Sequence, residues 1–321
     1  MRQILITGGM GFIGKNLTWK LLLEGGNHVT IVDNLSSSFI DPKILKNPNV
    51  KFYQSNFEKW MPDKGIKYSQ IYHLTSPVGP LGVLKYKGNI AKMILEQLYH
   101  ASEMAIKMEA KLLEISTSEV YGCHPEDELG GQREDINKIV PSNLTVRLEY
   151  GVAKLLCEIV LKNLSRDNRL KYICIRPFNI VGPKQNEELG FIIPRFIKQV
   201  ISGDPITVYG DGSQKRTLTH VQDFVDAIYL AMESTIDGEV YNVGNPNNIC
   251  TVNQIANKVS ELFGGGRIEY VDPTKLFKDF SEAWNKIPNI EKIVSHLGWY
   301  PKYNLDYIFD EIKNKKITYL N

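Results

Sequence analysis

The sequence predicts an α/β protein with a doubly wound parallel sheet and a smaller, loop-rich C-terminal lobe. Two observations predict this fold. Short, β-branched apolar runs alternate with longer segments of helical periodicity through the first half of the chain, and such alternation gives right-handed crossovers between parallel strands. The second half carries more prolines and shorter helical segments, which is typical of a lobe that covers one end of a sheet.

The predicted strands are short and almost wholly apolar, as expected of strands that are buried on both faces of a parallel sheet. The first helix is predicted from apolar residues that recur near one face between Phe12 and Leu22. The predicted strands span residues 4–6, 29–32, 50–53, 71–74, 112–115 and 172–175, and the predicted helices span 12–23, 86–107 and 147–166.

The character of the chain changes after Arg176. Prolines become frequent there, at Pro177, Pro183, Pro194 and Pro205. We therefore predict a first domain over residues 1–178, completed by about 217–245, and a second lobe made of 179–216 and 246–321.

The charge balance argues against a nucleic-acid or membrane-surface partner. Lys and Arg number 38 and Asp and Glu 36, so the net charge of +2 implies no strong positive field. Neither the histidines nor the cysteines (Cys123, Cys157, Cys174 and Cys250) show metal-ligand or CxxC spacing, so neither a metal site nor a disulfide framework is expected. Without a signal-peptide pattern or an apolar run of the ~20 residues that a membrane span needs, the prediction is a cytoplasmic protein.

A glycine-rich turn between the first predicted strand and the first predicted helix is the strongest local signal. Gly8, Gly11 and Gly14 follow the spacing G-x-x-G-x-x-G. The first glycine permits a tight turn, the second lets the backbone approach a pyrophosphate, and the third lets the helix pack closely on the sheet. The first turn of the helix, with Phe12 and Ile13, offers free N–H groups to phosphates. This pattern predicts a dinucleotide site on a Rossmann fold.

An acidic residue at the end of the second predicted strand indicates which dinucleotide binds. Asp33 lies 19 residues after Gly14, where a carboxylate can accept both ribose hydroxyls of an adenosine. Its charge would repel the 2′-phosphate of NADP. Asn34 and the rest of residues 34–38 supply no arginine or lysine to bind that phosphate. The sequence therefore predicts NAD as the cofactor.

Tyr150 and Lys154 form a YxxxK pair on one face of a predicted helix. The Lys154 ammonium can hold the nicotinamide ribose and lower the pKa of Tyr150, so that the tyrosine removes a hydroxyl proton while hydride leaves the substrate. Thr117, Ser118 and Glu119 follow a predicted strand, at the carboxyl edge where open α/β sheets bind ligands. These five residues are the predicted catalytic group.

Several motifs along nearly the whole chain carry a family resemblance. They are GGMGFIG (8–14), VDNLSS (32–37), HLTSP (73–77), STSEVYG (116–122), YGVAK (150–154), RPFNIVGP (176–183), YGDGSQKR (209–216) and YNVGNPNN (241–248). With these motifs the chain resembles the extended short-chain dehydrogenase/reductases, the NAD-dependent epimerases, dehydratases and decarboxylases of nucleotide-sugars. In that family the YxxxK pair and a serine or threonine form the hydride-transfer triad.

The resemblance also implies further site residues. On the cofactor side it implies contacts from Leu74 and from Asn56, which stands where the family usually carries an aspartate that contacts the adenine amine. On the substrate side it implies that the second lobe binds a nucleotide-sugar, with a UDP-sugar favoured. The substrate-binding residues implied in this way are Asn179, Arg216, Arg147 and Tyr209.

Within the family, the segment STSEVYG is most similar to the UDP-glucuronate decarboxylases. Ser118 stands where dTDP-glucose 4,6-dehydratases carry an aspartate that protonates a departing C6 hydroxyl, and CO2 leaves without such an acid. Oxidation of a uronate at C4 gives a ketone β to the carboxylate, and Arg216 suits a diphosphate or a carboxylate. A 4-epimerase or a 4,6-dehydratase stays the alternative, since GDP-mannose 4,6-dehydratases also carry an STSE motif. A non-catalytic NAD sensor is less favoured because Tyr150 and Lys154 are intact.

The resemblance further implies a homodimer formed through a four-helix bundle. The predicted helices 86–107 and 147–166 carry apolar residues on more than one face. The alternative is that both helices simply pack against the sheet.

Overall fold

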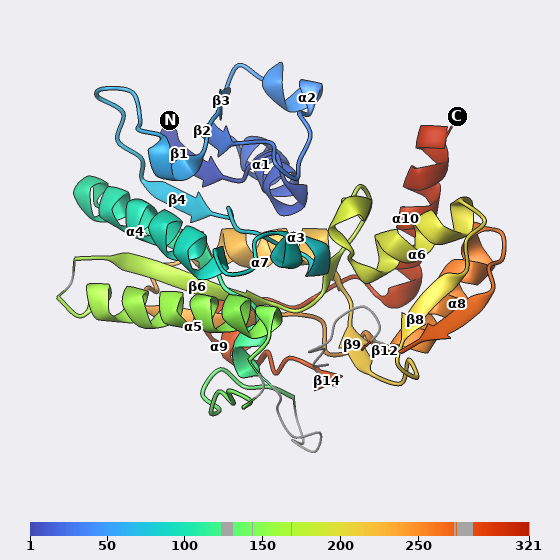
Figure 1. The fold of residues 1–321 in the computed structure, drawn as a ribbon. Helices are drawn as coiled ribbons and strands as arrows, with labels where there is room; N and C mark the ends of the chain where they lie inside the picture. The colour runs from blue at the N-terminus through green and yellow to red at the C-terminus, as the bar shows by residue number, and fades with distance from the viewer. Residues whose placement is uncertain (123–130, 143, 168, 273, 275–284, 321) are drawn as a thin grey trace.

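The largest sheet has seven strands. It lies between layers of helices in the larger part of the molecule, at the left of Figure 1. The computed structural model describes residues 1–122, 131–142, 144–167, 169–272, 274 and 285–320, with side chains as far as 315. The strands are β1 (Arg2–Thr7), β2 (Asn27–Asp33), β3 (Val50–Gln54), β4 (Gln70–His73), β5 (Lys111–Ile115), β6 (Lys171–Pro177) and β11 (Glu239–Val243). They lie in the order β3-β2-β1-β4-β5-β6-β11, and every neighbouring pair is parallel. The predicted doubly wound parallel sheet is confirmed.

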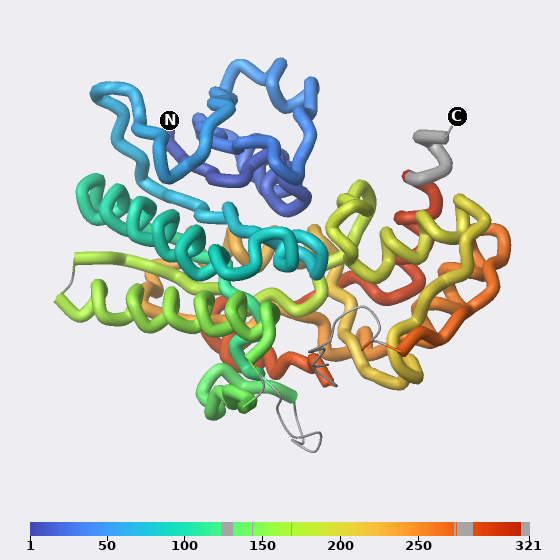
Figure 2. Tube along the Cα trace, in the orientation of Figure 1, coloured from blue at the N-terminus to red at the C-terminus, as the bar shows by residue number. Residues whose placement is uncertain are grey.

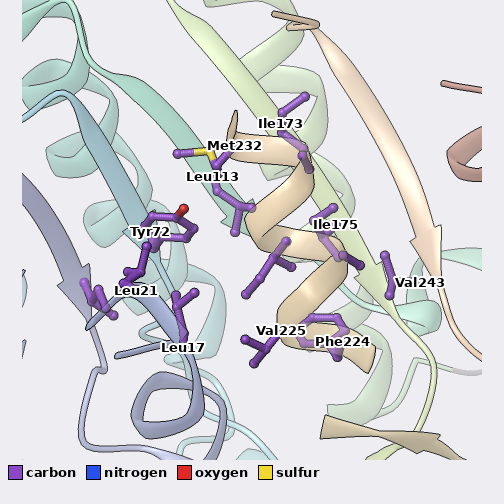
Figure 3. Close-up of a cluster of buried hydrophobic side chains, with 14 of the residues drawn as sticks. Leu17, Leu21, Tyr72, Leu113, Ile173, Ile175, Phe224, Val225, Met232 and Val243 are labelled. Atoms are coloured by element: carbon purple, nitrogen blue, oxygen red, sulfur yellow. The ribbon is translucent and has the colours of Figure 1, made fainter. Parts of the chain in front are cut away.

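Helices cover both faces of this sheet. The pair α1 (Phe12–Glu24) and α7 (Val221–Glu233) packs on one face, and the pair α4 (Ile90–Met108) and α5 (Val146–Ser165) packs on the other. Successive residues of β6 alternate between the faces: Ile173 and Ile175 contact the α7 side, drawn in Figure 3, whereas Tyr172 and Cys174 join the cluster on the α5 side. Burial on both sides explains why the strands are apolar throughout.

The helix predicted over 86–107 begins later, at Ile90. Gly88 has a positive φ of 78°, which interrupts a helical backbone, and the residues before it form a separate short helix, α3 (Pro80–Lys85). The Glu149 carboxylate on α5 accepts a hydrogen bond of 2.7 Å from the backbone N–H of Gly88. The start of α4 is thus held by the neighbouring helix, a partner that periodicity does not reveal.

A smaller lobe, at the right of Figure 2, packs around its own apolar cluster. Phe196, Val259 and Phe309 are buried in that cluster. The elements of this lobe are α6 (Ile192–Ile201), β8 (Ile206–Tyr209), β9 (Lys215–Thr217), β12 (Ile249–Thr251), α8 (Val252–Phe263), β13 (Ile268–Val271), β14 (Asn285–Lys286) and α10 (Leu305–Leu320). The remaining short elements are α2 (Pro42–Leu45), β7 (Ile180–Val181), β10 (Thr219–His220), and the 3₁₀ helices η1 (Phe57–Lys59), η2 (Ser118–Tyr121) and η3 (Glu187–Leu189).

One C-terminal helix packs with the sheet rather than with the lobe. Ile293 of α9 (Glu291–Leu297), and Trp299 just after it, lie in the apolar cluster that α1 and α7 share. The predicted division of the chain into a domain and a lobe stays a prediction. Helix α9 belongs to the range 246–321 predicted for the lobe, yet it contacts β11 of the large sheet.

Cys157, Cys174 and Cys250 are buried and form no disulfide, whereas Cys123 lies outside the described residues. Within the described part of the chain, no cluster of three or more His, Cys, Asp or Glu side chains could hold a metal ion. No helix in that same part is both long and apolar enough to cross a membrane. The cytoplasmic location stays a prediction.

Candidate active site

A cavity of about 1020 Å³ lies at the carboxyl ends of the strands. Its wall runs from the glycine turn after β1, past the ends of β2, β4 and β5, to side chains of the second lobe. The strand order turns back on itself between β1 and β4, and open α/β sheets bind ligands in the crevice at such a switch point. Of the site residues predicted from the sequence, all but Asn56 line this cavity.

The glycine turn forms a cradle that larger residues could not build. Gly8 has a positive φ of 68°, and a Cβ added at Gly14 would lie 2.5 Å from the carbonyl oxygen of Gly8. Gly11 precedes α1 and has no side chain that could cap this helix end. The first-turn N–H groups of α1, at Phe12 and Ile13, therefore stay available to an anion at the cavity wall. This cradle fits the pyrophosphate of a dinucleotide.

Asp33 ties the glycine turn to the loop that follows β2. One carboxylate oxygen accepts a 2.9 Å hydrogen bond from the N–H of Met10, and the other accepts from the N–H of Leu35 at 2.8 Å and from Ser38 Oγ at 2.9 Å. The carboxylate lines the cavity next to Asn34, so it is held in place beside the expected adenosine ribose.

Asn56 lies next to Asn34, and its predicted contact with the adenine stays a prediction. It does not line the cavity, and its amide oxygen accepts a 2.8 Å hydrogen bond from the Asn34 side chain. Leu74, in contrast, lies at the cavity wall, where its backbone contacts the turn at Gly8. Asn56 is therefore placed to orient Asn34.

Tyr150 and Lys154 lie one turn apart on α5 and both reach the cavity. Burial raises the pKa of Tyr150, and the Lys154 ammonium partly offsets this effect. The nearby Thr117 hydroxyl also lowers the pKa of the Tyr150 phenol. Lys154 itself is 2% exposed, and its Nζ donates to Glu114 Oε1 at 2.9 Å and to the carbonyl oxygen of Ile115 at 2.7 Å. The pair therefore has the geometry of a proton-transfer group.

Glu119 is an ion-pair centre rather than an acid. It accepts hydrogen bonds from Arg147 Nε at 2.7 Å and Nη2 at 2.9 Å, and from the Nζ of Lys286. Burial raises the pKa of Glu119, but these two cations more than offset the burial and hold the pKa well below its usual range. The carboxyl group therefore stays ionised and cannot donate a proton near neutral pH. Ser118 beside it is buried and lines the same cavity.

Lys286 is a cavity residue that the sequence reasoning missed. It lies on β14, which pairs with β9 so that Lys286 stands opposite Arg216 in the ladder. Burial lowers the pKa of Lys286 to about 8, the charges of Arg147 and Arg216 add to this effect, and Glu119 opposes it. Two cations thus bind Glu119 and a third, Arg216, lies beside Lys286, so positive charge gathers at this end of the cavity and suits an anionic ligand.

The far end of the cavity combines an aromatic ring with a buried cation. The Arg195 guanidinium lies 4.6 Å from the ring centroid of Tyr209 and donates to Thr207 Oγ1 at 2.7 Å. Burial lowers the pKa of Arg195, so solvent does little to stabilise its charge. Asn179, with a positive φ of 41°, has a buried side-chain nitrogen without a hydrogen-bond partner in the described part of the protein. These groups can bind a base and a diphosphate.

The fold and the site together define an NAD-dependent enzyme. The chain belongs to the NAD dependent epimerase/dehydratase family, whose model matches residues 4–244. It is 32% identical to UDP-glucuronic acid decarboxylase 1 of Xenopus tropicalis, over 99% of this chain and 72% of that protein. It is 28% identical to a UDP-N-acetyl-alpha-D-glucosaminuronate decarboxylase of Bacillus cytotoxicus, over 94% of this chain and 93% of that protein.

A solved structure also resembles this chain along its length. The UDP-glucose 4-epimerase of Thermotoga maritima, in complex with UDP-glucose, superposes with a TM-score of 0.84 at 27% identity and covers 99% of this chain and 100% of its own.

Proposed function

We propose that this enzyme decarboxylates UDP-glucuronate or a related UDP-uronate. The observation that carries the proposal is the cationic end of the cavity, where Lys286 and Arg147 both bind a Glu119 that stays ionised. A neutral hexose needs no such charge, whereas a uronate brings a carboxylate at C6. Two relatives that match nearly the whole chain are named as uronate decarboxylases.

The first domain holds the cofactor in this proposal, and the second lobe holds the nucleotide-sugar. Gly8, Gly11 and Gly14 receive the pyrophosphate, Asp33 receives the adenosine ribose, and Lys154 receives the nicotinamide ribose. Bound NAD supplies a hydride acceptor at C4 of the sugar and returns the hydride later. Leu74, Phe12 and Ile13 form the apolar wall of this half of the cavity.

Tyr150 takes the proton of the C4 hydroxyl. The Lys154 ammonium and the nearby Thr117 hydroxyl both favour the phenolate of Tyr150. All three groups line the cavity, so the proton passes directly from the C4 hydroxyl to Tyr150 and stays there while C4 is oxidised. Tyr150 and Lys154 serve any substrate that is oxidised at C4, so they do not by themselves select the uronate.

Loss of CO2 follows from the position of the ketone. A C4 ketone is β to the carboxylate on C5, so the electrons of the breaking bond flow into the carbonyl and form an enolate. Tyr150 and Ser118 lie where they can stabilise that oxygen. Lys286 and Arg147, both bound to Glu119, lie at the end of the cavity that receives the carboxylate of the substrate. Ser118 provides no acid that could expel a C6 hydroxyl.

The nucleotide occupies the far end of the cavity. Tyr209 and Arg195 lie beside the base, and Asn179, whose buried side-chain nitrogen has no partner in the described structure, contacts the diphosphate or the sugar. Arg216 suits the diphosphate because its fork binds phosphate oxygens in bidentate fashion.

The proposed function is tested with a panel of substrates. The enzyme is incubated with NAD and, separately, with UDP-glucuronate, UDP-N-acetylglucosaminuronate, UDP-glucose and GDP- and dTDP-hexoses, and the products are identified by NMR. We expect CO2 and a UDP-pentose from a uronate. Epimerisation or dehydration of an uncharged hexose, with no CO2 from either uronate, would instead assign a 4-epimerase or a 4,6-dehydratase.

A first prediction concerns the choice of dinucleotide. The wild-type protein should bind NAD more tightly than NADP, because the Asp33 charge repels a 2′-phosphate. Asp33→Ala combined with Asn34→Arg should shift the preference towards NADP through electrostatics. Calorimetric titration measures both affinities, and Asp33→Asn serves as a control that removes the charge while keeping an acceptor for the N–H of Met10. Equal wild-type affinities for the two dinucleotides would contradict this prediction.

A second prediction concerns assembly, for which we propose a homodimer through α4 and α5. Val152, Leu156 and Ile159 form an outward stripe on α5, with exposed fractions of 41%, 40% and 49%, and Tyr99 of α4 is 47% exposed. Such a stripe is unfavourable in water and suits a helix of a second copy.

Light scattering at micromolar protein should give a dimer, and Ile159→Glu should give a monomer. Leu23→Glu is the matched control, because Leu23 is 83% exposed on α1, away from this stripe. A monomeric wild-type protein would rule out the dimer.

A further inference from the structure

A buried carboxylate lies behind the Tyr150–Lys154 pair. Glu114 on β5 is 0% exposed, and its Oε1 accepts the 2.9 Å hydrogen bond from Lys154 Nζ. The other oxygen of Glu114 accepts a hydrogen bond from Nδ1 of His73, on the neighbouring strand β4. Because an ionised carboxylate only accepts, Nδ1 of His73 carries the proton. Glu114 and His73 do not line the cavity, so their influence on the reaction passes through Lys154.

The surroundings of Lys154 make a counter-ion necessary. Burial disfavours an ammonium, and without compensation it lowers the pKa of a lysine by several units. The groups that face Lys154 are Tyr150 and Cys157 from its own helix, and Glu114 and the Ile115 carbonyl from β5. Among the described residues, Glu114 is the one carboxylate that pairs with Lys154. Burial lowers the pKa of Lys154, yet Glu114, followed by Tyr150 and Cys157, more than offsets the burial, so the pKa lies above the usual lysine value.

Glu114 affects Tyr150 in two opposite ways. Its own charge raises the pKa of Tyr150, and Glu119 acts in the same direction. The Lys154 charge lowers that pKa, and its effect is larger than that of either carboxylate. Glu114 itself faces Lys154 and His73, with the thiols of Cys157 and Cys174 nearby. Glu114 therefore favours the phenolate of Tyr150 only indirectly, because it keeps Lys154 protonated.

We propose that Glu114, oriented by His73, is a positioning residue that keeps Lys154 protonated and fixed against Tyr150. The proposal rests on the proposed role of Tyr150 and Lys154 in proton transfer, and it holds for any sugar that is oxidised at C4. A charged residue that is fully buried within a central strand is costly unless it is paired. Glu114 is paired on both oxygens, and one partner is the lysine of the YxxxK pair.

The test measures the protonation of Lys154 directly, without substrate. The protein is labelled with [ε-¹³C]lysine, and the signal that disappears in Lys154→Met is assigned to Lys154. In Glu114→Gln, which keeps the shape and removes the charge, the midpoint of this titration should move to lower pH by about one to three units. Glu158→Gln is the matched control: Glu158 is a buried carboxylate on the same helix, but it pairs with Arg176. An unchanged midpoint in Glu114→Gln would overturn the proposal.

Kinetics provide a second readout on the intact enzyme. In Glu114→Gln, kcat should decline at a lower pH on the alkaline side while KM stays unchanged, and Glu114→Asp should restore part of the wild-type profile. A uniform loss of kcat at every pH, without a displaced alkaline limb, would indicate a merely structural role. Because the NMR titration needs no turnover, a failed decarboxylase assignment leaves this inference standing.

A folding defect in Glu114→Gln would still decide the question. If the variant unfolds because Lys154 has lost its counter-ion, the double variant Glu114→Leu/Lys154→Met should fold, since replacing both members of a buried pair by apolar groups is tolerated far better than removing one. A double variant that also fails to fold would place the role of Glu114 elsewhere and overturn the proposal.

Discussion

Replacing Tyr150 with phenylalanine should lower turnover by about 10²-fold or more, because general acid–base catalysis contributes on that order. The phenylalanine ring keeps the shape of the cavity wall and removes the hydroxyl whose pKa Lys154 and Thr117 lower. The affinity for NAD should stay unchanged, since the cradle at Gly8–Gly14 and the Asp33 carboxylate are untouched. Steady-state kcat with the substrate found in the panel, together with calorimetric titration of NAD, measures both quantities.

Two further variants make this result specific. Tyr300→Phe changes an exposed tyrosine outside the cavity and should leave kcat at the wild-type value. Lys154→Met should reduce both kcat and the affinity for NAD, since Lys154 combines a charge effect on Tyr150 with a proposed ribose contact. A Tyr150→Phe enzyme with a near wild-type rate would show that another group takes the proton.

The fold and the cofactor half of the cavity could be predicted because their signals are local. The spacing of Gly8, Gly11 and Gly14 predicts a tight turn and a close approach of two backbone segments within one short stretch. The structure contains both the turn and the close approach. Strands that are apolar throughout indicate a sheet buried on both faces, and β6 contributes side chains to the apolar clusters on both faces. The YxxxK spacing likewise fixes the relative position of Tyr150 and Lys154 on one helix, whatever the rest of the chain does.

The counter-ions of the site could not be predicted because they depend on contacts across the fold. Lys286 reaches Glu119 only through the pairing of β14 with β9, which joins segments far apart in sequence. No local pattern marks a lone lysine in a two-residue strand. Arg195 likewise meets Tyr209 only when α6 and β8 pack. Glu114 did leave a signal, because a charged residue interrupts an apolar strand, but its partner could not be read from that strand.

The role given to Glu119 depends on the same contacts. From the sequence, a carboxylate at this position after a strand could act either as a catalytic acid or as a hydrogen-bond acceptor. Its ion pairs with Arg147 and Lys286 hold its pKa well below the usual range, so the acceptor role is the one the geometry allows.

The largest effect on substrate selection should come from Lys286. Lys286→Met should weaken binding of a UDP-uronate by about 2–5 kcal/mol, the usual cost of leaving a buried charge without its partner, which is roughly 30-fold to several thousandfold in affinity. UDP-glucose, which lacks the carboxylate, should bind almost as well to the variant as to the wild type. Arg216→Ala should instead weaken both ligands, because we assign Arg216 to the diphosphate that they share.

The pH dependence separates Lys286 from cations that are always charged. Burial, Arg147 and Arg216 lower the pKa of Lys286 to about 8, so the ammonium is present below that pH and is lost above it. KM for a UDP-uronate should therefore rise above about pH 8 in the wild type, while the affinity for UDP-glucose stays level. Lys286→Arg, whose guanidinium keeps its charge, should remove this rise. A KM for the uronate that stays flat through the alkaline range in the wild type, or a Lys286→Met variant that loses both ligands equally, would show that the carboxylate is bound elsewhere.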